Sequence, residues 1–143
     1  EDGPVYQIAK SATDASYPEK ISYDKEDILV VIEGLSMYLK EADILQMFSV
    51  IEKNFPKATV FIETMSPFFV KHIKEKSIEG SQAKFVWGIK NGKALQELIP
   101  AFTYKKEVSL VEGMKKMMPI YHVLGKIPAV RNISNKIIVM EKN

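Results

Sequence analysis

Two carboxylates stand at the ends of two apolar segments of the chain. Glu33 directly follows the run of residues 28–32, and Glu63 lies near the end of residues 58–64. A continuous run of aliphatic and β-branched residues predicts a strand that is buried on both faces, as in parallel sheets covered by helices. Open α/β sheets bind their ligands beyond the carboxyl ends of the strands. Glu33 with Gly34 therefore indicates a ligand-recognition site. The alternative interpretation is a simple strand-to-helix turn.

Asp14 and Tyr38 could also do chemistry, and both of them, like Glu63, have a purely structural explanation as well. Spacing alone favours an Asx-turn or a helix entry for Asp14, because aspartate accepts hydrogen bonds from nearby backbone amides. Tyr38 could line an acceptor pocket, although a packed tyrosine with a backbone partner is commoner. Glu63 could face a crevice, whereas an exposed strand-end carboxylate is the default interpretation. The sequence assigns a catalytic role to none of them.

The composition gives little support to thiol or metal chemistry. The chain has no cysteine, which rules out disulfides, thiolate ligands and cysteine nucleophiles. Its two histidines, His72 and His122, lie far apart in the chain, so a zinc site would need an unusual coincidence. We therefore expect no metal site.

Length and charge narrow the class of protein further. The 143 residues, of which 46% are hydrophobic and 27% charged, predict one globular domain over residues 1–143. A formal charge of +2 is too weak for a nucleic-acid footprint, and no apolar stretch reaches the roughly 20 residues that span a bilayer. The chain starts at Glu1 without the layout of a secretory signal, so we expect further sequence upstream and a cytoplasmic location.

The first half of the chain predicts alternating strands and helices. A weak strand is expected at residues 5–9, and Ser16 suits the start of a short helix. After the strand of residues 28–32, apolar residues at helical spacing predict an amphipathic helix that ends before Pro56: Ile44, Met47, Phe48 and Ile51. Residues 58–64 then read as a second strand, and the order strand, helix, strand favours a parallel crossover.

The second half is less regular. Ser66 with Pro67 predicts a helix through about residue 77, and Trp87 is expected in the core. Asn91 and Gly92 indicate a turn before a short helix, and strands are expected at residues 102–110 and 137–140. Three methionines lie in an interrupted stretch between these strands and are better explained as gap-filling core than as a binding surface: Met114, Met117 and Met118.

Several short motifs together resemble one known family. They are residues 11–17 (SATDASY), 33–39 (EGLSMYL), 54–58 (NFPKA) and the pair Ser66-Pro67. The chain resembles the leucine carboxyl methyltransferase family, and within it the bacterial branch of polyketide O-methyltransferases of the tetracenomycin type. The resemblance runs through nearly the whole chain with the motifs in the family's order, and the Glu-Gly-x-x-Met-Tyr element is its most specific part.

The resemblance implies an α/β fold, the C-terminal part of a Rossmann-like class I methyltransferase that uses S-adenosyl-L-methionine. Such a sheet has seven strands in the spatial order three, two, one, four, five, seven, six. It is mostly parallel with an antiparallel final hairpin and is flanked by helices. This chain would begin near strand three, because the family's Gly-rich cofactor turn has no G-x-G-x-x-G counterpart here.

The resemblance also implies roles for individual residues. Asp14 and the backbone of Ala15 would contact the adenine edge of the cofactor, and Glu33 would lie beside its methionyl end. Tyr38 remains a possible residue of the acceptor pocket. The implied reaction is the transfer of a methyl group to a hydroxyl or carboxyl of a small molecule, which needs positioning more than acid or base catalysis. Because the family's Gly-rich cofactor half has no counterpart here, we expect this part alone to be inactive.

A partial sheet has consequences for partners. If strands one and two are absent, the strand that ends at Glu33 has an unpaired edge, and we expect a dimer or other self-association through it. The alternative function is a noncatalytic α/β protein-interaction module, which would use the same edge and the methionine-rich stretch.

Overall fold

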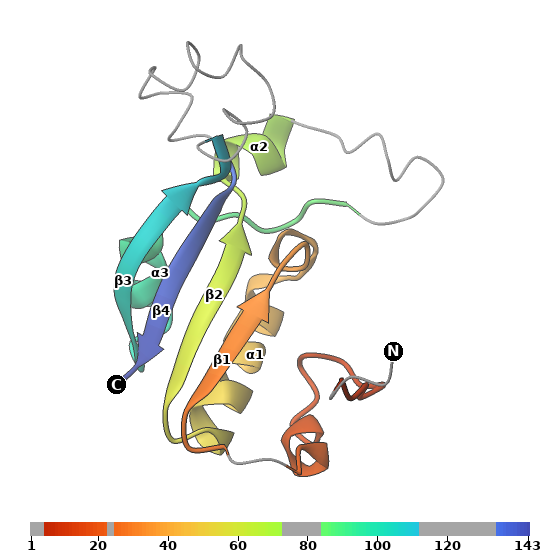
Figure 1. Cartoon of the computed structure of the whole chain (residues 1–143). Coiled ribbons are helices and arrows are strands. Elements are labelled where there is room, and N and C mark those ends of the chain that lie inside the picture. The colour runs from red at the N-terminus through yellow and green to blue at the C-terminus, as the bar shows by residue number, and fades with distance from the viewer. Residues whose placement is uncertain (1–4, 23–24, 73–83, 112–133) are drawn as a thin grey trace.

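An open sheet of four strands, with α-helices against one of its faces, forms the frame of the molecule (Figure 1). This computed structural model describes residues 5–22, 25–72, 84–111 and 134–143. The strands lie in the order β1-β2-β4-β3. The structure is therefore of the mixed α/β class, as the sequence predicts.

The first two strands form a parallel pair. β1 (Ile28–Ile32) and β2 (Ala58–Thr64) are joined by α1 (Glu41–Asn54), and Ile28 lies opposite Ala58 while Ile32 lies opposite Ile62. The carboxyl ends of both strands therefore meet at the same edge of the sheet. This arrangement confirms the predicted crossover and brings Glu33 and Glu63 to one end of the molecule.

The last two strands pair in the opposite sense. β4 (Lys136–Lys142) lies between β2 and β3 (Phe102–Ser109) and runs antiparallel to both of them. The predicted final antiparallel pair is confirmed. β1, β2 and β3 run in one direction and β4 alone among the described strands is reversed, although β1 with β2 is the one directly paired parallel couple among them.

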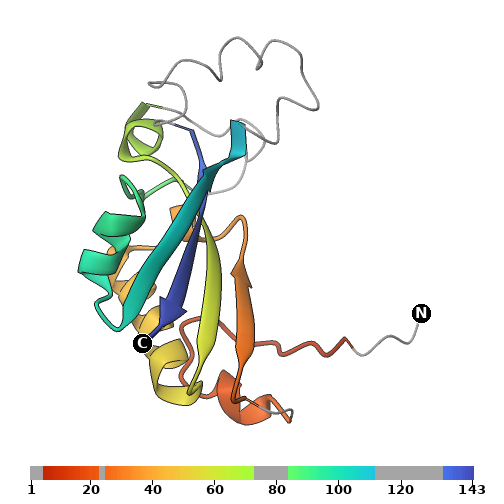
Figure 2. The ribbon, with the colours of Figure 1, turned by 60° about the vertical axis from the view of Figure 1, so that its left-hand side comes forward.

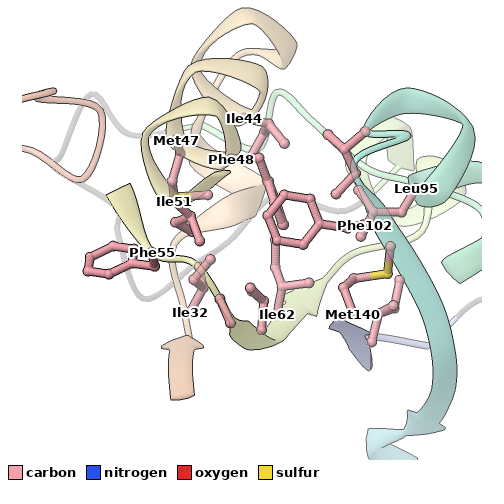
Figure 3. Close-up of a cluster of buried hydrophobic side chains, with 14 of the residues drawn as sticks. Ile32, Ile44, Met47, Phe48, Ile51, Phe55, Ile62, Leu95, Phe102 and Met140 are labelled. Carbon is pink, nitrogen blue, oxygen red and sulfur yellow. The ribbon is translucent and has the colours of Figure 1, made fainter. Parts of the chain in front are cut away.

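The helices supply one layer of the core. In α1, Ile44, Met47, Phe48 and Ile51 are buried and face the sheet, as their helical spacing predicts (Figure 3). The ring of Phe48 meets that of Phe102 edge-on, with centroids 5.1 Å apart. α3 (Gly92–Leu98) extends this layer over β3 and β4 with Leu95, which is fully buried.

The short helices begin where the sequence places caps. The backbone amide of Phe69 donates to Oγ of Ser66 at the start of α2 (Pro67–His72), and that of Ala94 donates to Oδ1 of Asn91 at the start of α3. Asn91 is therefore the N-cap of α3, and Gly92 is the first residue of that helix. The predicted continuation of α2 to residue 77 lies outside the described residues.

The opposite face of the sheet carries no helix among the described residues (Figure 2). Leu29 and Val31 of β1 are 61% and 60% exposed on that face, and Val108 of β3 is 48% exposed. Burial of residues 28–32 on both faces is therefore wrong. Because α1 packs against one face only, the alternate side chains Ile28, Val30 and Ile32 enter the core while their neighbours face outward.

The segment before β1 does not join the sheet. The strand expected at residues 5–9 is absent, because this segment pairs with none of the four strands of the sheet, and Val5 and Tyr6 are largely exposed. A 3₁₀ helix, η1 (Tyr17–Lys20), follows Ser16 as predicted. Trp87 is buried, whereas the predictions for Met114, Met117, Met118 and His122 concern residues outside those described.

Candidate functional site

The carboxyl end of β1 turns sharply at Glu33 and Gly34. Gly34 adopts a φ of 63°, in the left-handed region that glycine occupies without the penalty of a side chain. The side chain of Glu33 is exposed, and it forms no hydrogen bond or ion pair with another described residue. A second 3₁₀ helix, η2 (Ser36–Tyr38), begins directly after the turn. The turn thus presents a carboxylate that is available to a ligand.

Glu63 at the end of β2 holds this turn in place. Its Oε2 accepts a hydrogen bond from the backbone amide of Gly34 at 3.0 Å, and its Oε1 accepts one from Nδ2 of Asn135 at 3.1 Å. The hydroxyl of Ser36 donates to the backbone carbonyl of Glu63. The default interpretation of Glu63 as a plain exposed carboxylate is therefore wrong, because its side chain is half-buried and bonded on both oxygens.

Asp14 forms the Asx-turn that its spacing favours. Its Oδ1 accepts hydrogen bonds from the backbone amide of Ser16 at 2.8 Å and from the Ser16 hydroxyl at 2.6 Å, and Lys10 Nζ lies 3.3 Å from Oδ2. The Ser16 hydroxyl, its amide and then Lys10 lower the pKa of Asp14 to about 2. Asp14 is therefore a carboxylate at neutral pH, and Ala15 beside it is exposed.

The segment that carries Asp14 and the end of β1 border the same hollow. The hollow has a volume of about 340 Å³, and its lining includes Lys10, Ala12 and Tyr17 from the segment of Asp14 and Glu33 and Leu35 from the turn after β1. Most of its remaining lining is apolar, from β1 and α1. Asp14 is not among the lining residues, but it lies between Ala12 and Tyr17 in the chain. The volume is within the range of small-molecule sites.

A second, smaller hollow lies on the other side of Glu33. It has a volume of about 160 Å³ and is lined by residues of β1 and β2, by Leu110 and by Ile137, with Glu33 and Glu63 both in its wall. In the described part of the chain, His, Asp and Glu side chains form no group of three or more that could hold a metal ion. Glu33 therefore stands between two hollows, of which the larger also receives the Asp14 segment.

Tyr38 lies in a different environment. Its ring packs against that of Phe85, with centroids 5.3 Å apart and an interplanar angle of 39°. The neighbouring carbonyl of Met37 accepts a hydrogen bond from the backbone amide of Val86 at 2.8 Å. Tyr38 does not line the 340 Å³ hollow, so the structure brings the Asp14 segment and Glu33 to one site and places Tyr38 beside it.

Two residues of the site are missing from the sequence-based interpretation. Lys10 pairs with Asp14 and lines the larger hollow, and because residues 10–14 are not helical, the i, i+4 spacing of these opposite charges does not indicate the pair from sequence. Asn135 meets Glu63 across 72 positions of the chain, and no local pattern encodes such a pair.

No helix of the described residues has the length and apolar character needed to cross a membrane.

Similarity to characterised proteins covers part of this chain. The chain matches no family model. It is similar to the tetracenomycin polyketide synthesis O-methyltransferase TcmP of Streptomyces glaucescens, with 29% identity over 86 residues. The similar region is 59% of this chain and spans about a third, 32%, of the length of that relative. The similarity indicates a methyltransferase relationship for that part of the chain.

Proposed function

We propose that this chain is the C-terminal part of a class I O-methyltransferase that uses S-adenosyl-L-methionine and transfers its methyl group to a hydroxyl or carboxyl of a small molecule. The observation that carries the proposal is the hollow of about 340 Å³ at the carboxyl end of β1, which is lined both by Glu33 and by residues of the segment that carries Asp14. Ligands of open α/β sheets bind at such strand ends.

The strand order supports the proposal. If the segment before β1 corresponds to strand three, then β1, β2, β3 and β4 correspond to strands four, five, six and seven. The order β1-β2-β4-β3 then reads four, five, seven, six, which is the corresponding half of the class I sheet. The similarity to TcmP, whose name includes O-methyltransferase, supports the same assignment.

The residues around the hollow suit the cofactor. The free carboxylate of Glu33 can accept hydrogen bonds from the ammonium of the methionyl group. Asp14 is ionised, and a carboxylate has acceptor sites beyond those that Ser16 and Lys10 use, so it can accept from the exocyclic amine of adenine. The exposed backbone of Ala15 can donate to a ring nitrogen. The cofactor would supply an electrophilic methyl group, and the chain would hold its two ends.

Methyl transfer places few demands on side chains. The reaction is an in-line displacement at the methyl carbon, and orienting the acceptor oxygen accounts for much of the rate gain. We assign no catalytic residue. We place the acceptor site near Tyr38, which follows Gly34 by four residues in the chain. The proposal includes a cytoplasmic location, in line with the absence of cysteine.

Calorimetric titration with S-adenosylhomocysteine tests the proposal. The unmodified chain, which has no Gly-rich cofactor turn, should bind it weakly, and Glu33→Gln should reduce that binding about tenfold because a charge-assisted hydrogen bond is lost. Glu97→Gln, at an exposed position on α3, is the matched control and should bind like the unmodified chain. Equal binding by Glu33→Gln and the control would contradict the assignment of Glu33.

A protein-interaction module is the second candidate, and one observation favours it. Leu29 and Val31 expose apolar side chains on an edge strand, which is a surface that added strands use. This candidate predicts that the chain binds no S-adenosylhomocysteine and that charged substitutions at Leu29 and Val31 abolish its association with other chains. The titration above therefore separates the two candidates.

A further inference from the structure

We infer that Glu63 is a positioning residue, which fixes the turn at Gly34 and so aims Glu33 at its ligand. The inference rests on the proposed function for the identity of that ligand. Asp14, Ala15 and Glu33 are proposed to contact the cofactor. Glu63, at the end of β2, instead holds the turn in place.

The geometry gives Glu63 two different partners. One carboxylate oxygen accepts from the backbone amide of Gly34, 3.0 Å away, and the other accepts from Nδ2 of Asn135, 3.1 Å away. Gly34 belongs to the turn after β1, whereas Asn135 directly precedes β4. The single carboxylate therefore ties together three segments: the end of β2, the turn that carries Glu33 and the entry to β4.

The turn at Gly34 needs this hydrogen bond to keep its conformation. Gly34 has a φ of 63°, and a glycine is free to leave that conformation when nothing holds its amide. Because the amide of Gly34 follows the carbonyl of Glu33, the bond to Glu63 fixes the peptide plane between these two residues. The hydroxyl of Ser36, which is fully buried, donates to the carbonyl of Glu63 and anchors the other end of the turn.

The bond to Asn135 extends the tie to the connection between β3 and β4. The carbonyl of Asn135 accepts from the backbone amide of Leu110 at 2.9 Å, so these two residues close the base of that connection. Leu110 also lines the smaller hollow beside Glu33 and Glu63. Glu63 thus links the turn at Gly34 to Leu110. It accepts from the side chain of Asn135, and the carbonyl of Asn135 accepts from the amide of Leu110.

Amide exchange measured by NMR on the full chain tests the tie. Glu63→Met keeps the length of the side chain and removes both acceptors, and Asn135→Asp places a second carboxylate against Glu63. In each variant the Gly34 amide should exchange about tenfold faster or more, because its hydrogen bond to a charged group is lost or strained. In Glu63→Gln combined with Asn135→Asp, the glutamine can accept from Gly34 and donate to the new aspartate, so exchange should return to within about threefold of the unmodified chain.

The same samples, titrated with S-adenosylhomocysteine, test the effect on ligand binding. Amides of Glu33 and Gly34 should shift in the unmodified chain, with an affinity about tenfold lower in Glu63→Met and restored in the double variant. Glu97→Met on α3 is the control and should behave like the unmodified chain. Unchanged Gly34 exchange in Glu63→Met, or unchanged affinity in that variant, would overturn the inference. If the amides of the unmodified chain do not shift at all, the proposed function fails, whereas the exchange result still decides whether Glu63 sets the turn.

Discussion

Glu33 and Glu63 have the same side chain at corresponding strand ends, and their surroundings separate their roles. Both oxygens of Glu63 accept hydrogen bonds from other parts of the fold, so its carboxylate is committed to the structure. Glu33 is exposed and has no such partner among the described residues, so its carboxylate is available. The two hydrogen bonds hold the Glu63 side chain in one orientation, toward Gly34 and Asn135, whereas no such bond fixes the side chain of Glu33. The site is therefore built from one acid that binds and one that supports it.

Asp14 gives a prediction at the scale of a single residue. Its pKa is lowered from 3.8 to about 2, first by the Ser16 hydroxyl and then by the Ser16 amide. Since the pKa is lower in the folded chain, the stabilisation is fully present above about pH 4 and is lost as the pH falls through about 2. Ser16→Ala removes the largest cause and should move the pKa back toward its ordinary value.

Carboxyl ¹³C shifts followed through an acid titration would measure the pKa of Asp14 in the unmodified chain and in Ser16→Ala. A midpoint for Asp14 near its ordinary 3.8 in the unmodified chain would contradict the described Asx-turn. An identical midpoint in Ser16→Ala would contradict the role of the hydroxyl.

At the scale of elements, a half-buried ion pair joins α3 to the last two strands. Nζ of Lys136, on β4, donates to Glu107 Oε1 at 2.9 Å and to the carbonyl of Lys90 at 3.3 Å. The other oxygen of Glu107, on β3, accepts from the backbone amide of Gly92 at 2.7 Å. Gly92 opens α3, and a Cβ there would lie 2.1 Å from the ring of Tyr104. Glycine and the ion pair together let α3 approach β3 closely.

Lys136→Met tests the ion pair. The Lys136 side chain is only 10% exposed and that of Glu107 is 24% exposed, so the substitution leaves a poorly solvated carboxylate with one partner fewer. We expect the free energy of unfolding to fall by about 1–3 kcal/mol, measured by urea denaturation. Lys106→Met, at an exposed position on the same strand as Glu107, is the control and should change it by less than about 0.5 kcal/mol. Equal stability of both variants would show that the pair contributes nothing.

Most of the described elements could be predicted from local sequence, although the strand expected at residues 5–9 is absent. The apolar run of residues 28–32, the helical spacing from Ile44 to Ile51 and the caps Ser66 and Asn91 each act within a few positions, so pattern alone suffices. Sheet order does not follow from local pattern, because β4 pairs with β2, a strand far away in the sequence, and only the family resemblance implied an order. The exposure of Leu29 and Val31 also depends on which layers cover the sheet, and their residue types do not reveal it.

The candidate site could be predicted only in part for the same reason. Glu33 and Asp14 belong to short motifs, so sequence alone selects them. The bonds of Glu63 to Gly34 and Asn135 join positions 29 and 72 residues apart, and only the folded sheet brings them together. Tyr38 shows that closeness in sequence is not enough. It lies near Glu33 in the chain but does not line the larger hollow.

At the scale of the whole molecule, β1 is an edge strand with exposed apolar side chains. Such edges pair with other strands, and we predict that the chain self-associates through β1. Combining Leu29→Lys with Val31→Lys should shift the sedimentation profile toward the monomer, because lysines on an edge strand oppose pairing. Val108→Lys, on the same face of the sheet but on β3 at its opposite edge, should leave the association unchanged.

A species that sediments as a monomer at every concentration would contradict this prediction. An equal effect of Val108→Lys would assign the association to the open face rather than to the β1 edge.

The central claim is that the Asp14 segment and the Glu33 turn hold opposite ends of one cofactor molecule. The most direct measurement is a map of nuclear Overhauser contacts between the labelled chain and bound S-adenosylhomocysteine. The account predicts contacts from the adenine protons to Ala15 and from the homocysteine protons to Gly34. Adenine contacts at a distant surface, such as the groove between α1 and α3 lined by Leu45 and Leu98, would contradict it.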